Sequence, residues 1–178
     1  IPVKQFFKKK NIWFEKFVDL SKDNKTKFIN KKINIKQIEK KFHFKISDNQ
    51  KFIEYSPLGL RYLQDIGKII KKNNGGLLII DYGYNKEKMR DTLQAICKQK
   101  YSNILENIGT SDITYNINFR LIKKIFQNST QLNTKFTTQK KFLVKMGIKK
   151  RAEIISKNKT FTEKVDIYYR LKRLINGK

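Results

Sequence analysis

Residues 75–84, with the sequence GGLLIIDYGY, indicate the fold class. Four consecutive apolar residues, Leu77 to Ile80, follow two glycines and end at Asp81. A short apolar run between turn-forming residues is typical of a strand buried on both faces, as in parallel or mixed sheets covered by helices. A carboxylate at the carboxyl end of such a strand lies where open α/β sheets bind their ligands. Asp81 is therefore either a ligand-binding residue or a cap of the following loop.

The segment before this strand has the signals of a helix. Ser56 is a favourable N-cap, and Pro57 is favourable at the first helical position. Lys71 and Lys72 suit the negative end of the helix dipole. We expect a helix over residues 57–72 that leads directly into the apolar strand, which is half of a βαβ unit.

Strand and helix patterns alternate through the rest of the chain. Ile12–Leu20 and Lys27–Ile33 flank a polar turn and are expected to form a β-hairpin. Residues 112–119 alternate between apolar and polar side chains, which predicts a half-buried strand. Further helices are expected at residues 34–44, 119–126, 138–146, 149–156 and 160–175.

The last of these helices has a defined start and a predicted apolar face. Thr160 and Glu163 have the spacing of a capping box. The apolar face is predicted to consist of Phe161, Val165, Tyr168, Leu171 and Ile175. Because no internal repeat and no low-complexity linker interrupts the chain, residues 1–178 are expected to form a single domain.

Length and composition favour a folded domain. The chain has 178 residues, of which 39% are hydrophobic and 12% aromatic, too many for a disordered segment. No apolar run has the length of a membrane span, and the opening IPVKQFFKKK is not a signal peptide. Cys97 is the single cysteine and cannot form an internal disulfide. Because the first residue is Ile rather than Met, we expect an N-terminus that is internal to a longer protein.

The net charge of +26 allows two interpretations. A strongly basic chain can bind nucleic acid or another polyanion. However, only six of its 41 basic residues are arginine, the residue that reads bases and phosphates bidentately, and the lysines are spread along the whole chain. The abundance of Lys, Asn and Ile is also what the codon usage of an AT-rich genome produces. Both interpretations stay open at the level of sequence.

The common catalytic motifs are absent from the sequence. It has no GxGxxG, P-loop, CxxC, HExxH or GxSxG pattern. His43 is the only histidine and has no second metal-ligating residue near it, so we interpret it as structural and expect no metal site. The residues alone therefore predict an α/β domain with a polar cluster around Asp81 and the strand that begins at Asp112.

Seven stretches, taken in order, nevertheless resemble one protein family. They are IPVKQF at 1–6, the hairpin stretch WFEKFV at 13–18, IEYSPLGL at 53–60, GGLLIIDYG at 75–83, DTLQA at 91–95, SDITYNINF at 111–119 and TTQKKFLVKMGIKKRA at 137–152. Together they resemble the MidA family of S-adenosylmethionine-dependent methyltransferases. The mitochondrial member of that family is the arginine methyltransferase needed for assembly of respiratory complex I. The resemblance extends over essentially the whole chain.

The resemblance implies a fold and a cofactor. The fold is a Rossmann-like class I methyltransferase with an inserted β-hairpin and extra helices, and the cofactor is S-adenosyl-L-methionine. It also implies that residues 1–178 are the C-terminal portion, without the N-terminal cofactor-binding half and the last C-terminal strand. Pro2 matches the end of an upstream motif and is a weak cofactor-binding candidate. On this basis we expect the isolated fragment to be inactive.

The resemblance also assigns candidate site residues. The catalytic candidates are Asp81, Asp112 and Thr114. A guanidinium is held by carboxylates that pair with it bidentately, so Asp81 and Asp112 are expected to clamp the substrate or to remove its proton. The alternative is that Asp112 caps a turn and Thr114 bonds the backbone. The substrate-binding candidates are Tyr82, Gly83, Gln94, Asn118, Phe119, Thr138 and Gln139.

Two positions depart from the family pattern. Many members have histidines where Gln99 and Asn116 stand here, so any proton transfer by those histidines is lost or replaced. The implied substrate is a protein arginine, by analogy in a subunit of a respiratory NADH dehydrogenase. The implied compartment is a bacterial cytoplasm, or the mitochondrial matrix in a eukaryote. The alternatives are a basic nucleic-acid-binding module and a non-catalytic assembly or scaffold protein.

Overall fold

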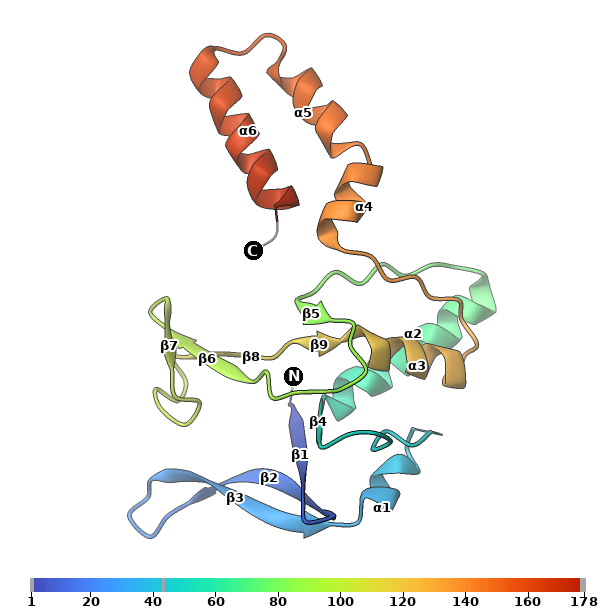
Figure 1. Cartoon of the computed structure of the whole chain (residues 1–178), viewed down its shortest axis with the longest axis vertical. Helices are drawn as coiled ribbons and strands as arrows, with labels where there is room; N and C mark the ends of the chain where they lie inside the picture. Colours follow the sequence, from blue (N-terminus) through green and yellow to red (C-terminus); the bar gives the residue numbers. More distant parts are fainter. Residues whose placement is uncertain (1, 43, 177–178) are drawn as a thin grey trace. The chain divides into compact units, whose positions relative to one another are not determined.

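The computed structural model describes residues 2–42 and 44–176 and has a mixed α/β architecture, as the sequence predicted (Figure 1). The chain divides into two compact units, Ile1–Thr134 and Lys135–Lys178. The first unit contains all the strands of the described residues and three of the helices, and the second contains three helices. Each unit is described by itself below.

A four-stranded antiparallel sheet forms the base of the first unit. Its strands are β1 (Lys4–Lys9), β2 (Ile12–Leu20), β3 (Thr26–Ile33) and β4 (Phe52–Tyr55), and they lie in the order β3-β2-β1-β4. The predicted hairpin is confirmed: β2 pairs with β3 from Trp13 opposite Ile33 to Leu20 opposite Thr26. Lys10 and Asn11 turn the chain between β1 and β2 with positive φ angles of 46° and 63°.

The hydrophobic core lies against one face of this sheet. Phe6 on β1 and Ile53 on β4 are fully buried, and the ring of Tyr55 stacks on Phe6 with centroids 5.9 Å apart. Leu121 and Ile125, from the helix α3 (Phe119–Ser129), complete the cluster from the other side. Because neighbouring residues of a strand point to opposite faces, the burial of Ile53 and Tyr55 places Glu54 on the other face of β4.

The helix α2 (Pro57–Asn73) follows β4 directly and confirms the predicted helix over 57–72. The hydroxyl of Ser56 accepts a hydrogen bond from the Gly59 N–H at 3.1 Å, as expected for an N-cap. α2 packs on α3 at Gly67, where an added Cβ would lie 3.0 Å from the Thr130 methyl group and 3.1 Å from the Phe126 ring. Glycine therefore allows the close approach of the two helices.

The apolar stretch Leu77–Ile80 is not a buried strand, which corrects the prediction made from sequence. None of the residues 75–82 belongs to a strand, and the side chains of Leu78 and Ile80 are 60% and 72% exposed. A strand is buried on both faces only where other strands and helices lie beside it. Residues 2–42 and 44–176 supply no such neighbours, and the expected βαβ unit is not completed among them.

Two small sheets follow this stretch. β5 (Gly83–Tyr84) pairs in parallel with β9 (Ile117–Asn118), and β6 (Gln94–Cys97) lies between β7 (Lys100–Ser102) and β8 (Asp112–Thr114) in an antiparallel sheet. The single strand predicted for 112–119 is therefore divided. β8 pairs with β6, the chain passes through two unpaired residues, and β9 then pairs with β5. Alternation of side chains could not reveal this change of partner.

The second unit consists of α4 (Gln139–Lys145), α5 (Ile148–Ser156) and α6 (Phe161–Ile175). The predicted capping box of α6 is confirmed, since Thr160 and Glu163 bond each other's backbone N–H groups. The predicted apolar face of α6 is partly wrong. Its half-buried side chains are Ile167, Leu171 and Ile175, whereas Phe161, Val165 and Tyr168 are exposed. The helix thus has two apolar stripes, and packing covers only one.

The described part of the chain contains neither a membrane-spanning helix nor a cluster of metal-ligating side chains. No helix there combines the length and apolar character needed to cross a membrane. No group of three or more His, Cys, Asp or Glu side chains there could hold a metal ion. The predicted structural histidine, His43, lies outside the described residues.

Candidate functional site

Glu54 is the centre of a buried polar network on the face of the sheet opposite the core. Its side chain lies on β4, two residues before the N-cap of α2, and the residue is only 4% exposed. The amide of Gln5 donates to one carboxylate oxygen at 2.6 Å. The Thr92 N–H donates at 3.2 Å, and the Thr92 hydroxyl also donates to the carboxylate. β1 and the segment after β5 therefore hold Glu54 in place.

Within the described part of the chain, the hydrogen-bond donors to the Glu54 carboxylate are neutral groups. None of the ion pairs among the described residues includes it. Carboxylates that are almost fully buried are usually paired with a cation. Because its donors are neutral, Glu54 is a candidate for contact with a cationic ligand.

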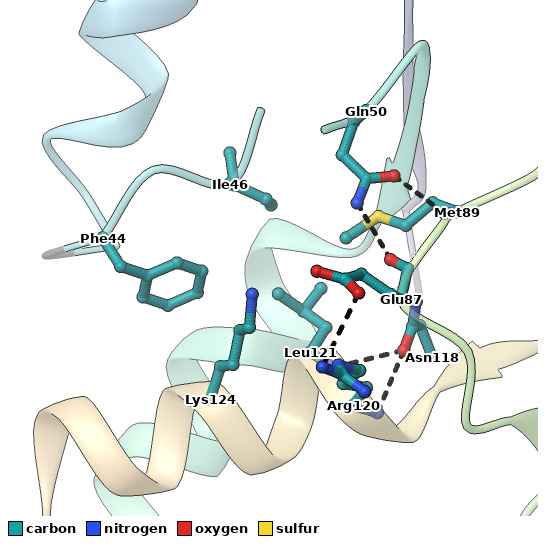
Figure 2. A pocket seen from close by; sticks show the side chains of 9 residues that line it. All are labelled: Phe44, Ile46, Gln50, Glu87, Met89, Asn118, Arg120, Leu121 and Lys124. Carbon is teal, nitrogen blue, oxygen red and sulfur yellow. Dashed lines mark hydrogen bonds and ion pairs between the residues drawn. The ribbon is translucent and has the colours of Figure 1, made fainter. Parts of the chain in front are cut away.

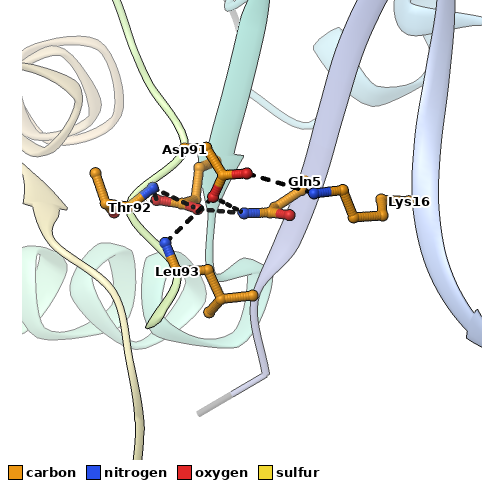
Figure 3. A network of polar contacts seen from close by, with 6 residues as sticks. Gln5, Lys16, Asp91, Thr92 and Leu93 are labelled. Atoms are coloured by element: carbon orange, nitrogen blue, oxygen red, sulfur yellow. Dashed lines mark hydrogen bonds and ion pairs between the residues drawn. The ribbon is translucent and has the colours of Figure 1, made fainter. Parts of the chain in front are cut away.

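Asp91 continues the network towards the surface (Figure 3). One of its carboxylate oxygens accepts from the Gln5 amide at 2.7 Å, and the other accepts from the Lys16 ammonium at 3.4 Å. Gln5 therefore joins two carboxylates, of which only Asp91 has a cationic partner. Because Lys16 lies on the neighbouring strand β2, the network also fixes β1 against β2.

Thr92 links this network to the segment between β8 and β9. Its hydroxyl accepts a hydrogen bond from the Asn116 N–H at 2.9 Å while it donates to Glu54. Asn116 is one of the two positions that depart from the family pattern described in the sequence analysis. In this structure the backbone N–H of Asn116 contacts the network through Thr92. This bond holds the neighbouring Tyr115 close to Glu54.

Two carboxylates influence the phenol of Tyr115. Burial raises the pKa of Tyr115, and the negative charges of Glu54 and Asp81 raise it further. Burial also raises the pKa of Tyr84, on β5. Both phenols are therefore protonated at neutral pH. Glu54 and Asp81 come from distant parts of the sequence, and the fold brings their negative charge to one side chain, where a cationic ligand would be favoured.

The predicted residues Asp81, Tyr82 and Gly83 form one bend of the chain. Asp81 is exposed and its carboxylate accepts from the Tyr82 N–H at 2.7 Å, while the Tyr82 carbonyl accepts from the Ile117 N–H at 2.9 Å. At Gly83 an added Cβ would lie 2.3 Å from the Ile117 carbonyl oxygen and 2.7 Å from the ring of Phe119. Glycine is thus needed for the contact between β5 and β9.

Three further predicted residues lie in the three-stranded sheet. The Gln94 amide donates to the Thr114 hydroxyl at 3.2 Å across β6 and β8, so these two candidates are brought together. Asp112 is exposed at the start of β8, opposite Ile96. It lies two residues from Thr114 on the same strand.

A surface hollow of about 400 Å³ lies beside Asp112. Gln99, the other position where family members often have histidine, contributes to its wall, together with Lys98. Lys98 and Gln99 form the two-residue turn between β6 and β7 with positive φ angles of 48° and 63°. The hydroxyl oxygen of Ser111 is buried in this region without a hydrogen-bond partner. The hollow can therefore accept a polar group, but it is open to solvent.

Asn118 has a structural role. Its side-chain oxygen accepts from the N–H groups of Arg120 and Leu121 at 3.0 and 3.2 Å and so caps α3. Next to it lies a cavity of about 20 Å³, where Arg120 pairs with Glu87 at 3.8 Å and the amide of Gln50 donates to the Glu87 carbonyl (Figure 2). This volume has room for about one water molecule. It is too small for a substrate.

The remaining predicted residues lie elsewhere in the chain. Thr138 and Gln139 belong to the second unit, where the Thr138 hydroxyl caps α4 and the Gln139 amide donates to the Leu174 carbonyl at 2.9 Å. Pro2 is exposed before β1. Thr138 and Gln139 have these structural contacts, and the binding roles of all three positions stay predictions.

Sequence reasoning missed the central residue of the network. Glu54 is an acidic residue between Ile53 and Tyr55 in an apolar strand, and it lies three residues before Pro57. A charged residue near the carboxyl end of a strand that enters a helix is a recognisable signal. Asp91 and Thr92 belong to the stretch DTLQA, in which only Gln94 is predicted as a site residue. Nothing in the sequence indicated that Gln5 would join Glu54 to Asp91.

The sequence is similar to a family of methyltransferases and to individual members with known names. A family model described as "Putative S-adenosyl-L-methionine-dependent methyltransferase" matches residues 1–138. The mitochondrial protein arginine methyltransferase NDUFAF7 of Danio rerio is 22% identical over 176 residues, which are 99% of this chain and 41% of that protein. The Homo sapiens protein of the same name is 24% identical over 157 residues, which are 87% of this chain and 34% of that protein.

Two crystal structures from Burkholderia thailandensis have a similar fold. One is a COG1565 superfamily protein with a TM-score of 0.76 and 16% identity, and the match covers 98% of this chain and 48% of that one. The other is a COG1565 superfamily member bound to S-adenosyl-homocysteine, with a TM-score of 0.73 and 15% identity over 98% of this chain and 46% of that one. The chain spans less than half the length of each of these relatives.

Proposed function

The chain belongs to the S-adenosyl-L-methionine-dependent methyltransferase family whose model it matches, and from this premise we propose that it carries the methyl-acceptor side of such an enzyme. We propose further that the acceptor is an arginine side chain of a protein, as in the name of the vertebrate relatives. The observation that carries this proposal is the buried carboxylate of Glu54, which Gln5 and Thr92 hold with neutral donors.

The described residues do not form a cofactor cradle by themselves. Family folds of this kind bind nucleotide cofactors at a glycine-rich turn between a strand and a helix. Here β3, β4 and β9 each lead into a helix through at most one residue, and that residue is not glycine. S-adenosyl-L-methionine supplies an electrophilic methyl group when it is bound, and the side chains of this chain act on the acceptor.

A guanidinium fits the charge of this site. It carries one positive charge and donor N–H groups that match carboxylates bidentately. Glu54 offers a carboxylate that Gln5 and Thr92 fix without neutralising it. Asp81 is exposed and can approach the same ligand from the solvent side. The two carboxylates hold the acceptor nitrogen in place, and either can accept the proton that this nitrogen loses on methylation.

Asp112 and Thr114 keep their predicted catalytic roles within this proposal. Asp112 borders the hollow on β8, and Thr114 is held by Gln94. A long arginine side chain or its flanking residues could occupy that hollow. The assignment of the substrate to a subunit of a respiratory NADH dehydrogenase rests on the family resemblance alone and on no contact in the structure.

The test is methyl transfer by the full-length protein that contains residues 1–178. The protein is incubated with methyl-labelled S-adenosyl-L-methionine and arginine-containing protein substrates. We expect Glu54→Gln to lower the transfer rate on the order of 100-fold while cofactor binding, measured by calorimetry, is unchanged. Glu87→Gln is the matched control, because the exposed carboxylate of Glu87 pairs with Arg120 and is not part of the Glu54 network. Equal activity of Glu54→Gln and wild type would refute the proposal.

A further inference from the structure

The helix α6 has an apolar stripe that its own unit leaves uncovered. Phe161, Val165 and Tyr168 are 83%, 51% and 64% exposed, and their spacing of four and three residues places them on one side of the helix. The half-buried Ile167 and Leu171 form a different side, which is the packed one. Apolar side chains that gather on one exposed side, bordered by polar residues, are typical of a contact surface for a protein or a membrane.

Lysines border this stripe. Lys164 lies four residues before Tyr168 and Lys172 lies four residues after it, so both lie beside the stripe. Both are exposed, and neither belongs to an ion pair of the described residues. The two acidic residues of α6, Glu163 and Asp166, lie on the opposite side of the helix, and each has a cationic partner. The charge beside the stripe is therefore positive.

The second unit is the more basic part of the chain. Residues 135–178 contain 14 basic and 3 acidic residues, which gives a net charge of +11 in 44 positions. Residues 1–134 have a net charge of +15 in 134 positions, which is less than half that density. The charge is therefore concentrated in the unit that exposes the stripe, and a positive surface of this kind attracts anionic partners.

The combination of apolar and basic side chains selects among anionic partners. Nucleic acid is bound through its phosphates and by stacking on its bases, and an aliphatic residue such as Val165 contributes little to either contact. A second copy of the unit would bring one net charge of +11 against another, which opposes association. An anionic lipid bilayer uses both features, because its acyl chains accept apolar side chains and its headgroups attract lysines.

We propose that the stripe of α6 docks on the surface of an anionic lipid bilayer. Phe161 and Val165 enter the boundary between headgroups and acyl chains, and Lys164 and Lys172 meet the lipid phosphates. Tyr168 suits the same boundary, because its ring is apolar and its hydroxyl is polar. The helix lies along the surface, since no helix of the described residues can cross a membrane. The proposal does not depend on the methyl-acceptor role of the first unit.

The first test compares two apolar residues of similar exposure on opposite sides of α6. Val165 is 51% exposed and Leu174 is 46% exposed, and their separation of nine residues is about two and a half turns. The full-length protein that contains residues 1–178 is sedimented with vesicles of phosphatidylcholine, alone or mixed with phosphatidylglycerol. We expect Val165→Gln to weaken binding to the anionic vesicles about 10-fold and Leu174→Gln to leave it unchanged. Binding to the neutral vesicles is expected to be weak for every variant.

The second test separates the two lysines of the stripe from the net charge of the chain. Lys164→Gln combined with Lys172→Gln is expected to weaken binding to the anionic vesicles about 10- to 30-fold. Lys22→Gln combined with Lys25→Gln, in the exposed turn between β2 and β3, removes the same charge from another surface. This control is expected to change binding by less than about threefold, because charges farther from the bilayer than the Debye length are screened.

A tryptophan in the stripe gives a readout that does not depend on a loss of binding. In Phe161→Trp we expect the emission to shift to shorter wavelength and to be quenched by brominated lipids in anionic vesicles, whereas the buried Trp13 of the wild type responds little. Equal losses in matched variants, equal binding to neutral vesicles, or an unchanged Phe161→Trp spectrum would each overturn the proposal. Self-association or RNA binding that Val165→Gln abolishes would overturn it too, because the stripe would then have a different partner.

Discussion

The hydroxyl of Thr92 donates a hydrogen bond to the buried carboxylate of Glu54, 38 residues away along the chain. The same hydroxyl accepts from the backbone N–H of Asn116 at 2.9 Å. One small side chain therefore connects β4 with the segment between β8 and β9. This connection holds Tyr115 beside Glu54, and it can be tested by substitution.

Removing the Thr92 hydroxyl is expected to destabilise the first unit. Thr92→Val keeps the volume of the side chain but removes one donor from the buried Glu54 carboxylate and leaves the Asn116 N–H without its acceptor, which costs about 1 to 3 kcal/mol. Thr92→Ser keeps the hydroxyl and is expected to be close to wild type. The free energy of unfolding is measured in urea. Thr110→Val, at an exposed loop hydroxyl, is the control, and a loss as large there as at Thr92 would contradict the role of the network.

Adding a methyl group at Gly83 is expected to separate β5 from β9. The new Cβ would lie 2.3 Å from the Ile117 carbonyl oxygen, a distance at which the backbone must move. We expect Gly83→Ala to lower the free energy of unfolding by at least about 1 to 3 kcal/mol. Gly76→Ala is the matched control, because its Cβ would meet nothing within 4 Å and its φ is not positive. That variant is expected to be neutral or slightly stabilising.

The buried Tyr55 is expected to make stability fall at alkaline pH. Burial, assisted by the nearby charge of Glu15, raises the pKa of Tyr55 to about 12, above the ordinary value of 10.0. The folded state therefore holds this proton more tightly than the unfolded state. The resulting stability, about 2 to 3 kcal/mol, is fully present below pH 10 and is lost as the pH rises towards 12.

The measurement for Tyr55 is the urea unfolding free energy at neutral pH and above pH 11. Because many lysines titrate in the same range, the wild type is compared with Tyr55→Phe, which lacks only the hydroxyl. We expect the difference between the two proteins to change by 2 to 3 kcal/mol in favour of the phenylalanine variant at high pH. A constant difference across that range would show that Tyr55 does not titrate on unfolding.

The capping box of α6 is expected to contribute measurably to the second unit. Thr160 accepts from the Glu163 N–H, and Glu163 accepts from the Thr160 N–H at 2.9 Å. Thr160→Ala removes the cap and is expected to cost about 0.5 to 2 kcal/mol and to reduce helical circular dichroism. Thr162→Ala, one position inside the exposed first turn, leaves the cap intact. If both variants lost the same amount of helix, capping would not explain the effect.

The sequence predicted an element correctly where the interactions that form the element lie within a few residues of one another. The helix over 57–72, the hairpin of β2 and β3 and the cap at Thr160 were confirmed, because a capping residue, a turn and side-chain periodicity act within a few residues. Leu77–Ile80 was wrongly predicted as buried, because the pattern describes what a strand needs rather than what surrounds it. The two stripes of α6 were merged for the same reason.

By itself, the sequence determined the class of fold, the ends of its main helices and, through its motifs, the methyltransferase family. These features follow from the spacing of residue types over short stretches, and that spacing can be read directly from the amino-acid sequence. Only the tertiary structure decided that Gln5, Glu54 and Thr92 form one network and that Glu54 and Asp81 both act on Tyr115. Their contacts depend on how strands pair across long separations, and burial and charge act through space rather than along the chain.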